Sequence, residues 1–373
     1  MALKIFWMFP IDNKKIIFCS YGGRQYSCNP KYLFEYIVGR YGNAFTYIWI
    51  LNSPCIMPEK YGSVKIIKFM SFQYIQHVLT AGIIIDNMAI KSFLPFRKNQ
   101  IILYTWHGGG AYKKVNIDAF FNKKYISSMK VTREVSARMV KYVISSCKKF
   151  TEVSSKAWAI PPEKFLPIGM PRNDIIFNIP ENTIKKVKDY FRLDYPKKIV
   201  LYAPTFRGDY NNANEMLFSL DVQDLLGSLN IKFGKDFVFL YRSHHASNKN
   251  TFDVKNNNIL SASDYNDMQE LLCATDVLIT DYSSCIWDFS FTYKPCFIYA
   301  PDLKSYKEEQ GFYTPVEDWP FPFSETNDKL FENILKFDSG KYINAVKKHH
   351  MDLSSYENGT ATKKLCEILF EGQ

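Results

Sequence analysis

A histidine followed by three glycines is the first feature of the sequence that could do chemistry. His107 comes directly after the apolar run 101–106, and Lys113 and Lys114 follow the glycines. An imidazole with a pKa of about 6.5 can accept a proton from a hydroxyl at neutral pH, and glycines let a substrate approach the backbone closely. We therefore predict that His107 is a catalytic base and that Gly108, Lys113 and Lys114 bind substrate. The alternative is a turn with a structural histidine.

Two further motifs place cations directly after apolar runs. One run leads into Thr205 and Arg207, and another ends at Arg242 with His244 two residues later. Side chains at alternate positions of an extended chain share a face, so Arg242 and His244 could hold a diphosphate together. Thr205 and Arg207 suit phosphate or ribose contacts, although a turn with a surface ion pair explains that motif when it is taken alone. His244 and His245 are adjacent rather than four residues apart on a helix, and no acidic ligand is nearby. His244 is therefore not expected to bind a metal.

A fourth apolar run, 277–280, leads into a polar turn and then a helix. The turn contains Asp281, Ser283 and Ser284, and Asp288 follows one helical turn later. Either serine could cap the helix, and the free N–H groups at a helix N-terminus bind anions. We predict that these four residues bind substrate, with the helix N-terminus as the anion site, although capping alone is compatible with the same pattern.

Alternating strands and helices position these motifs. This alternation is typical of βαβ units and a parallel sheet, in which ligands bind beyond the carboxyl ends of the strands. The Pro-rich segment 161–180 separates two such halves, so we expect two Rossmann-like domains facing a cleft, 1–175 and 176–373. The final helix, 361–370, has an apolar stripe that could pack back across the other domain. The expected strands are 14–21, 45–51, 64–70, 83–88, 101–106, 197–204, 237–242, 277–280 and 295–301, and the expected helices include 29–42, 72–82 and 266–276.

Positive charge is concentrated in the first half of the chain. Residues 1–180 carry 25 lysines and arginines against 9 acidic residues, a net charge of +16, whereas residues 181–373 carry 22 against 28, a net charge of −6. The densest stretch is 122–149, with eight cations and one acid. It is either a solvated helical face or a segment that binds an anionic membrane surface. No nucleic-acid-binding motif is present, so nucleic acid is not an expected partner.

The cysteine pattern, the spread of charge and the missing motifs exclude several classes of protein. The eight cysteines form no C-x-x-C pair, and we expect reduced core residues in a cytoplasmic protein rather than a zinc site. No window of about 18 residues is free of charge, so no membrane-spanning helix is expected, and no signal peptide is recognised. P-loop, dinucleotide-binding and hydrolase-elbow motifs are missing from the sequence.

Taken in order, the motifs resemble those of the CDP-glycerol glycerophosphotransferase family, whose members prime and polymerise teichoic acids and related capsule polymers. The resemblance covers nearly the whole chain. The chain differs from the family pattern in having Gly109-Gly110 after the first histidine motif and His245 after the second. The main matches are TWHGGGAYKK at 105–114, YAPTFR at 202–207, RSHH at 242–245 and DYSSCIWDF at 281–289, and the weaker ones are 20–37, 169–177, 311–313 and 357–364.

The resemblance implies a GT-B arrangement, with an N-terminal acceptor domain and a C-terminal CDP-alditol domain. It implies that an acceptor hydroxyl attacks CDP-glycerol and releases CMP, with His107 as base, and that His244 and Arg242 act on the diphosphate beside Ser283 and Ser284. No cofactor is implied. The expected acceptor is a lipid-linked saccharide or polymer, used by a peripheral enzyme on the inner face of the cell membrane. The alternatives are a CDP-ribitol enzyme, a GT-B glycosyltransferase using a nucleotide sugar, and a non-catalytic binding protein.

Overall fold

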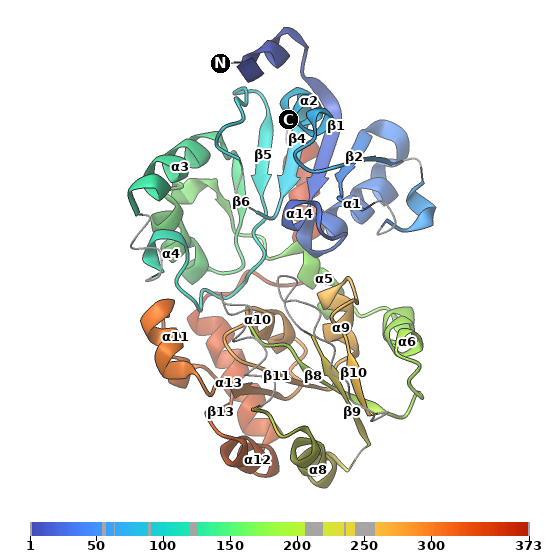
Figure 1. Ribbon diagram of the computed structural model, residues 1–373, viewed down its shortest axis with the longest axis vertical. Coiled ribbons are helices and arrows are strands. Elements are labelled where there is room, and N and C mark those ends of the chain that lie inside the picture. The colour runs from blue at the N-terminus through green and yellow to red at the C-terminus, as the bar shows by residue number, and fades with distance from the viewer. Residues whose placement is uncertain are drawn as a thin grey trace.

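The computed structural model describes residues 2–53, 57–62, 64–88, 91–119, 126–205, 219–234, 236–242 and 258–371, with the side chains of helix α3 described from Arg133 onward. These residues form two α/β domains, one above the other in Figure 1. Each domain contains one parallel sheet, of seven strands in the first and six in the second, among the described residues. This is the two-domain α/β class expected from the sequence.

The first sheet has the strand order β3-β2-β1-β4-β5-β6-β7, and every neighbouring pair is parallel. Successive residues of β1 enter different cores, with Ile17 in one cluster and Ile16 and Phe18 in the other. A sheet buried on both faces needs such continuous apolar strands. The strands are β1 (Asp12–Cys19), β2 (Thr46–Ile50), β3 (Lys65–Ile67), β4 (Ala81–Asp86), β5 (Ile101–Tyr104), β6 (Tyr142–Ile144) and β7 (Phe165–Leu166).

Helices cover this sheet on both sides. Helix α1 ends at Gly42, which adopts a positive φ of 52° and donates its N–H to the carbonyl of Val38. Ser71 caps helix α2 by accepting a hydrogen bond from the N–H of Tyr74. The helices are α1 (Cys28–Tyr41), α2 (Phe72–Thr80), α3 (Ile126–Met139) and α4 (Lys148–Trp158).

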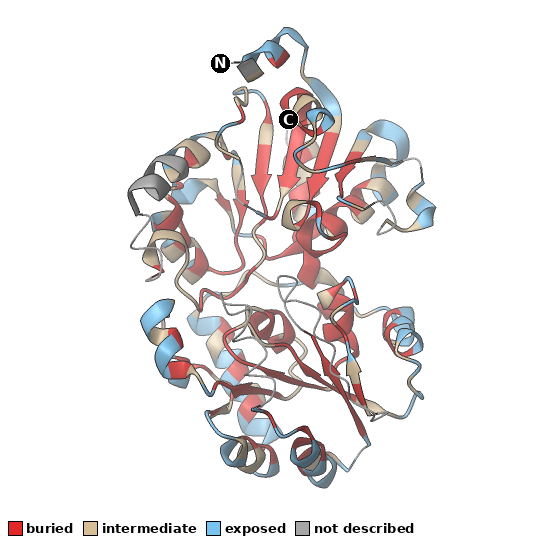
Figure 2. Cartoon of the chain, in the orientation of Figure 1, coloured by how far each residue is buried: buried red, intermediate tan, exposed pale blue. Residues whose placement is uncertain are grey.

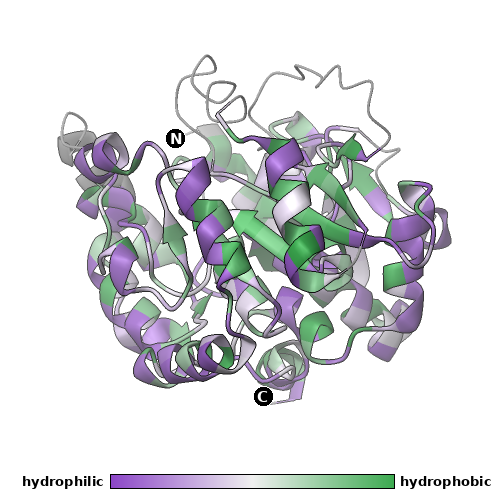
Figure 3. Cartoon of the chain, turned by 90° about the horizontal axis from the view of Figure 1, so that it is seen from below, coloured by the Kyte–Doolittle hydropathy of each residue, from purple (hydrophilic) through white to green (hydrophobic). Residues whose placement is uncertain are grey.

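The second sheet has the order β10-β9-β8-β11-β12-β13 and is also parallel. Its strands are red along most of their length in Figure 2, which marks them as buried, and Figure 3 shows hydrophobic strands behind helices with hydrophilic outer faces. The strands are β8 (Lys198–Tyr202), β9 (Phe237–Tyr241), β10 (Ile259–Ser261), β11 (Val277–Thr280), β12 (Cys296–Tyr299) and β13 (Phe323–Ser324). The helices are α5 (Asp174–Phe177), α6 (Glu181–Tyr190), α8 (Val222–Phe233), α9 (Met268–Ala274), α10 (Cys285–Ser290), α11 (Leu303–Glu309), α12 (Asn327–Leu335) and α13 (Ser339–Asp352).

The predicted strands are present, but the interpretation of two segments was wrong. The stretch 122–149 is not one helical face, because α3 is followed by β6 and by the start of α4. The Pro-rich stretch 161–180 is not only a connector, because β7 lies within it and pairs with β6. Strands β6 and β7 have three and two residues, too few positions for a period of two to be recognised, whereas β3 was expected from the longer apolar run 64–70.

The end of the chain returns to the first domain. Helix α14 (Ala361–Cys366) and the π-helical turn Glu367–Glu371 bring Leu365 and Leu369 into the core cluster that contains Leu33 and Phe34 of α1. Seven cysteines are described, and all are buried and free, whereas Cys55 lies outside the described residues. Among the described helices, none has both the length and the apolar composition that a bilayer crossing requires.

Candidate active site

His107 lies just beyond the carboxyl end of β5, as the sequence predicts, beside the end of β4. Its Nδ1 is 3.0 Å from the main-chain carbonyl oxygen of Asn87, which follows β4. A carbonyl oxygen can only accept, so Nδ1 carries the hydrogen and the neutral ring has its lone pair on Nε2. This tautomer is the one that a general base requires.

Arg172, which the motif analysis did not select, holds the loop of His107. Its Nη1 donates to the main-chain carbonyl of His107 over 2.7 Å, and its Nη2 lies 2.8 Å from Oδ2 of Asp288 on α10. Burial opposes the positive charge, but Asp288 and the other groups around the guanidinium together outweigh it, and the pKa of Arg172 is raised. The only sequence signal for this arginine was the weak family match at 169–177. Arg172 therefore connects the first domain to the second at the level of the histidine.

A small cavity of about 140 Å³ lies between the domains at this level. Its lining combines strand-end residues of both domains with Arg172 and contains two guanidinium groups and the Asp288 carboxylate. Such a lining favours an anionic ligand. The residues are Tyr21, Gln25, Ser27, Cys28, His107, Arg172, Ala203, Pro204, Arg242, Asn266, Met268, Gln269, Ser283, Ser284, Cys285 and Asp288.

Arg242 lines this cavity from the end of β9. Its side chain is buried, and Nη1 donates to the carbonyl oxygens of Ala262, at 3.0 Å, and Tyr265. These main-chain contacts hold the guanidinium in place, and within the part of the chain that the structure describes Arg242 forms no salt bridge. His244 and Arg207 lie outside the described residues, so their predicted contacts with the diphosphate remain predictions.

Asp281 and the two serines connect the ends of β8 and β11. Asp281 is fully buried, and its Oδ1 accepts from the N–H of Thr205 at 2.8 Å, from the Thr205 hydroxyl at 2.7 Å and from the N–H of Ser283. Asp281 lines neither of the two cavities of the site, but it positions Thr205 and Ser283, and its predicted contact with substrate stays a prediction. The expected serine cap is also missing, because Ser284 at the start of α10 accepts no capping hydrogen bond.

Asp288 is likewise occupied by protein groups. Its carboxylate is paired with Arg172 and accepts a hydrogen bond of 2.9 Å from the side-chain amide of Gln269. Although Asp288 contributes to the lining of the small cavity, these contacts use both of its oxygens. Asp288 therefore positions Arg172, and its predicted contact with substrate stays a prediction.

A second, larger cavity of about 420 Å³ is also lined by His107. The predicted substrate-binding residues Gly108, Lys113, Lys114 and Thr205 all line it. His107, Ser283 and Ser284 line both cavities, so the two cavities meet at these three residues. The predicted base therefore lies where the small, polar cavity meets the larger cavity.

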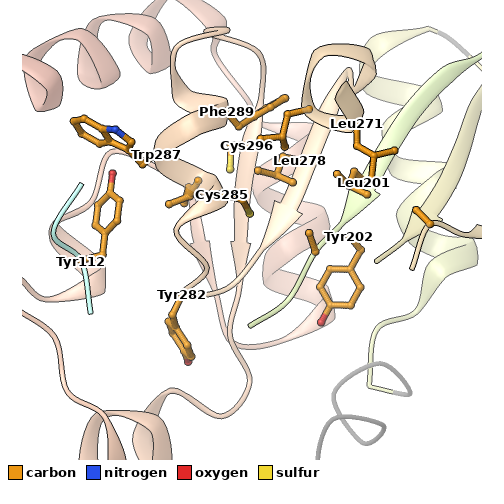
Figure 4. Close-up of a cluster of buried hydrophobic side chains, with 14 of the residues drawn as sticks. Tyr112, Leu201, Tyr202, Leu271, Leu278, Tyr282, Cys285, Trp287, Phe289 and Cys296 are labelled. Atoms are coloured by element: carbon orange, nitrogen blue, oxygen red, sulfur yellow. The ribbon is translucent and has the colours of Figure 1, made fainter. Parts of the chain in front are cut away.

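The glycines after His107 are required by close packing against the second domain. A Cβ on Gly109 would lie 2.0 Å from Cδ1 of Trp287, and Gly110 has a positive φ of 80°. Figure 4 shows Tyr112, from the same loop, beside Trp287 on α10. The two rings have their centroids 6.4 Å apart. Packing on Trp287 explains locally why this chain has Gly109-Gly110.

Two parallel α/β domains facing a cleft, with His107 and Arg242 at strand ends and Arg172 between them, define a two-domain transferase of the GT-B type. The chain belongs to the CDP-Glycerol:Poly(glycerophosphate) glycerophosphotransferase family, whose model matches residues 1–371.

Named relatives and a solved structure agree with this placement. The chain is 30% identical over 371 residues to a teichoic acid poly(glycerol phosphate) polymerase of Staphylococcus epidermidis, covering 96% of this chain but only 51% of the relative. It is 29% identical over 377 residues to a polymerase of the same description from Bacillus spizizenii, covering 99% and 95%. A structure of the wall teichoic acid polymerase TagF soaked with CDPG superposes with a TM-score of 0.82 at 28% identity, covering 97% and 90%. The chain therefore spans about half the length of one relative and nearly all of the other.

Proposed function

We propose that this protein transfers glycerol phosphate from CDP-glycerol to a hydroxyl of a lipid-linked or polymer acceptor and releases CMP, in the synthesis of a teichoic acid-like polymer. The observation that carries this proposal is the position of His107 at the junction of two cavities, one of them lined by Arg172 and Arg242. Family membership supports the same chemistry.

In the proposed reaction the acceptor oxygen attacks the β-phosphorus of CDP-glycerol. A new O–P bond forms while the bond between that phosphorus and the bridging oxygen breaks, and the electron pair leaves with CMP. Nε2 of His107 takes the proton of the attacking hydroxyl. Arg172 and Arg242 offset the negative charge that develops on the leaving phosphate, together with the predicted contributions of His244 and Arg207.

The donor is tested by thermal shift and by CMP release. Among CDP-glycerol, CDP-ribitol and UDP-sugars, CDP-glycerol should raise the melting temperature most and should release CMP in an acceptor-dependent manner. A larger shift with CDP-ribitol would assign the ribitol alternative. A larger shift with a UDP-sugar would make the protein a glycosyltransferase, and binding without any turnover would support a non-catalytic protein.

We propose further that the protein works at an anionic membrane surface. Large apolar side chains are exposed on the N-terminal 3-10 helix Ala2–Met8 and next to it, including Ile5 at 62% and Met8 at 82% exposure. Phe72 at the start of α2 is 71% exposed, and its ring packs against Phe6, with centroids 5.6 Å apart. Exposed apolar groups on a domain with a net charge of +16 over residues 1–180 suit a bilayer of anionic lipids.

Vesicle sedimentation tests this second proposal. The double variant Ile5→Ser/Met8→Ser should bind vesicles containing phosphatidylglycerol more weakly, by about tenfold or more, because about 0.8 kcal/mol is lost for each apolar carbon withheld from the bilayer. Ile231→Ser is the matched control, since Ile231 is 77% exposed on α8 of the acidic half of the chain. Equal binding by all three proteins would refute a membrane role for this surface.

A further inference from the structure

The two domains share a buried cluster of charges that lines neither cavity. Lys31 of α1, in the first domain, pairs with Asp267 and with Glu270 of α9 in the second, and its Nζ lies 2.9 Å from Oε1 of Glu270. These three side chains are 8%, 4% and 10% exposed. In Figure 1, α9 lies at the edge of the second domain nearest to α1. Because none of the three residues lines a cavity, direct contact with substrate does not explain the cluster.

Lys31 is an unfavourable residue for the first domain taken alone. It lies near the N-terminus of α1, where the helix dipole disfavours a cation, and burial by itself would lower its pKa. Attraction to Asp267 and Glu270 reverses this effect and raises the pKa of Lys31, so the lysine is charged in the folded protein. The cost of burying this cation is therefore offset mainly by carboxylates of the other domain.

The two carboxylates of the cluster are attached to the loop that holds Arg242. Oε2 of Glu270 accepts a 2.6 Å hydrogen bond from the hydroxyl of Tyr265, and Asp267 follows Tyr265 by two residues. Main-chain carbonyls of the same loop, at Ala262 and Tyr265, accept from Nη1 of Arg242. The first domain thus fixes this loop through its carboxylates, and the loop in turn fixes Arg242.

We propose that Lys31 is a positioning residue for the donor diphosphate, acting across the domain interface through the loop that holds Arg242. This role rests on the proposed function, in which Arg242 offsets charge on the diphosphate of CDP-glycerol. Among the described residues, Arg242 makes its protein hydrogen bonds through Nη1, which leaves Nη2 and Nε for a ligand in the small cavity. A planar guanidinium binds phosphate in a defined direction, so a displaced loop misaligns it. Because Lys31 belongs to the other domain, the alignment is complete only while the domains are in contact.

Isothermal titration calorimetry of the full chain tests this role, with CDP-glycerol and with inorganic pyrophosphate as a probe of the anion site alone. Lys31→Met removes the charge from a long side chain and should raise both Kd values by about tenfold or more. Lys31→Arg keeps the charge and should bring both Kd values to within about threefold of wild type.

The matched control is Lys186→Met. Lys186 pairs with the same Glu270, at 2.7 Å, but it does so from α6 of the second domain and is 62% exposed. An exposed ion pair within one domain contributes little, so both Kd values should stay within about twofold of wild type.

A double-mutant cycle with Arg242→Lys separates positioning from a general loss of stability. If Lys31 acts through Arg242, Lys31→Met/Arg242→Lys should bind CDP-glycerol within about twofold of Arg242→Lys alone. Additive losses, or a wild-type Kd in Lys31→Met, would overturn the role. If Lys31→Met does not fold, Tyr265→Phe takes its place in the cycle. It removes only the hydroxyl contact with Glu270 and should raise the Kd by about 3- to 10-fold, and an unchanged Kd would again overturn the role.

The two ligands distinguish failure of this role from failure of the proposed function. If wild type binds pyrophosphate but not CDP-glycerol, the proposed function fails, and the cycle measured with pyrophosphate decides the role of Lys31. If wild type binds only CDP-glycerol, the cycle measured with that ligand decides it. If wild type binds neither, Arg242 does not serve a diphosphate site, and the role of Lys31 fails together with the proposed function.

Discussion

The guanidinium of Arg172 donates a 2.7 Å hydrogen bond to the main-chain carbonyl of His107 and at the same time pairs with Asp288 of the other domain. The position of the predicted base is therefore set by a residue far along the chain and by a carboxylate across the cleft. Asn29 completes this support, since its side-chain amide donates to the carbonyl of Trp106 at 3.2 Å and its Oδ1 accepts from the N–H of Arg172.

Arg172→Lys should preserve the charge but lose the forked contact with both partners. We expect kcat to fall by about tenfold or more because the His107 loop loses its orientation, and we expect the protein to stay folded. Steady-state CMP release measures the effect. Lys156→Arg, the reverse exchange on the exposed surface of α4, should leave kcat unchanged. Wild-type kcat in Arg172→Lys would show that the forked contact is dispensable.

His107→Asn should abolish turnover without unfolding the protein. The asparagine amide can still donate to the carbonyl of Asn87, but no nitrogen is left to accept a proton. We expect kcat to fall by about 10²- to 10⁴-fold, with little change in the thermal shift given by CDP-glycerol. His77→Asn, at a histidine that contacts Lys65 away from the cleft, should keep full activity. Retained activity in His107→Asn would rule out the base.

Gly109→Ala should destabilise the contact between the domains. The added Cβ would overlap Cδ1 of Trp287 at 2.0 Å, so the loop or the indole must move. We expect a loss of about 1–3 kcal/mol in the free energy of unfolding, measured by urea denaturation. The control is Gly39→Ala in α1, where a Cβ meets nothing within 4 Å, and which should be stabilising by about 0.5–1 kcal/mol. Similar effects at both glycines would contradict the packing argument.

Two histidines of α13, His349 partly buried and His350 buried, should make the protein sensitive to acid. His349 Nε2 lies 2.9 Å from the hydroxyl of Tyr112, and His350 Nε2 lies 2.7 Å from Oγ of Ser290. Burial lowers the pKa of each histidine to about 4. Below the ordinary pKa of about 6.5, the unfolded chain takes up protons that the folded protein does not, so the free energy of unfolding falls from pH 6.5 towards pH 4.

The pH dependence is checked by urea denaturation of wild type and His349→Gln/His350→Gln at pH 7 and pH 5. Between pH 7 and pH 5, the free energy of unfolding of the wild type should fall by about 1–2 kcal/mol per histidine more than that of the double variant. Burial raises the pKa of Asp86 to about 7, which acts in the opposite direction, so only the difference between the two proteins is informative. Parallel losses would show that these histidines are protonated in the folded state.

Much of the fold and part of the site could be predicted from the sequence. Strands buried on both faces need continuous apolar residues, so β1, β5, β8 and β11 are visible as apolar runs. Polar motifs directly after such runs must lie at the carboxyl edge of a parallel sheet, because every strand points the same way. His107, Arg242, Ser283 and Ser284 are therefore brought to the cleft as predicted.

The sequence by itself determined the two parallel sheets and the residues that their strands deliver to the cleft, because both depend on local patterns. Only the tertiary structure decided which side chains hold those residues. Arg172 meets His107 and Asp288 at separations of 65 and 116 residues, and Gly109 meets Trp287 only because the domains pack there. The division of the site into a small, arginine-lined cavity and a larger one arises in the same way, since side chains from both domains build each wall, and no local periodicity records how two domains pack.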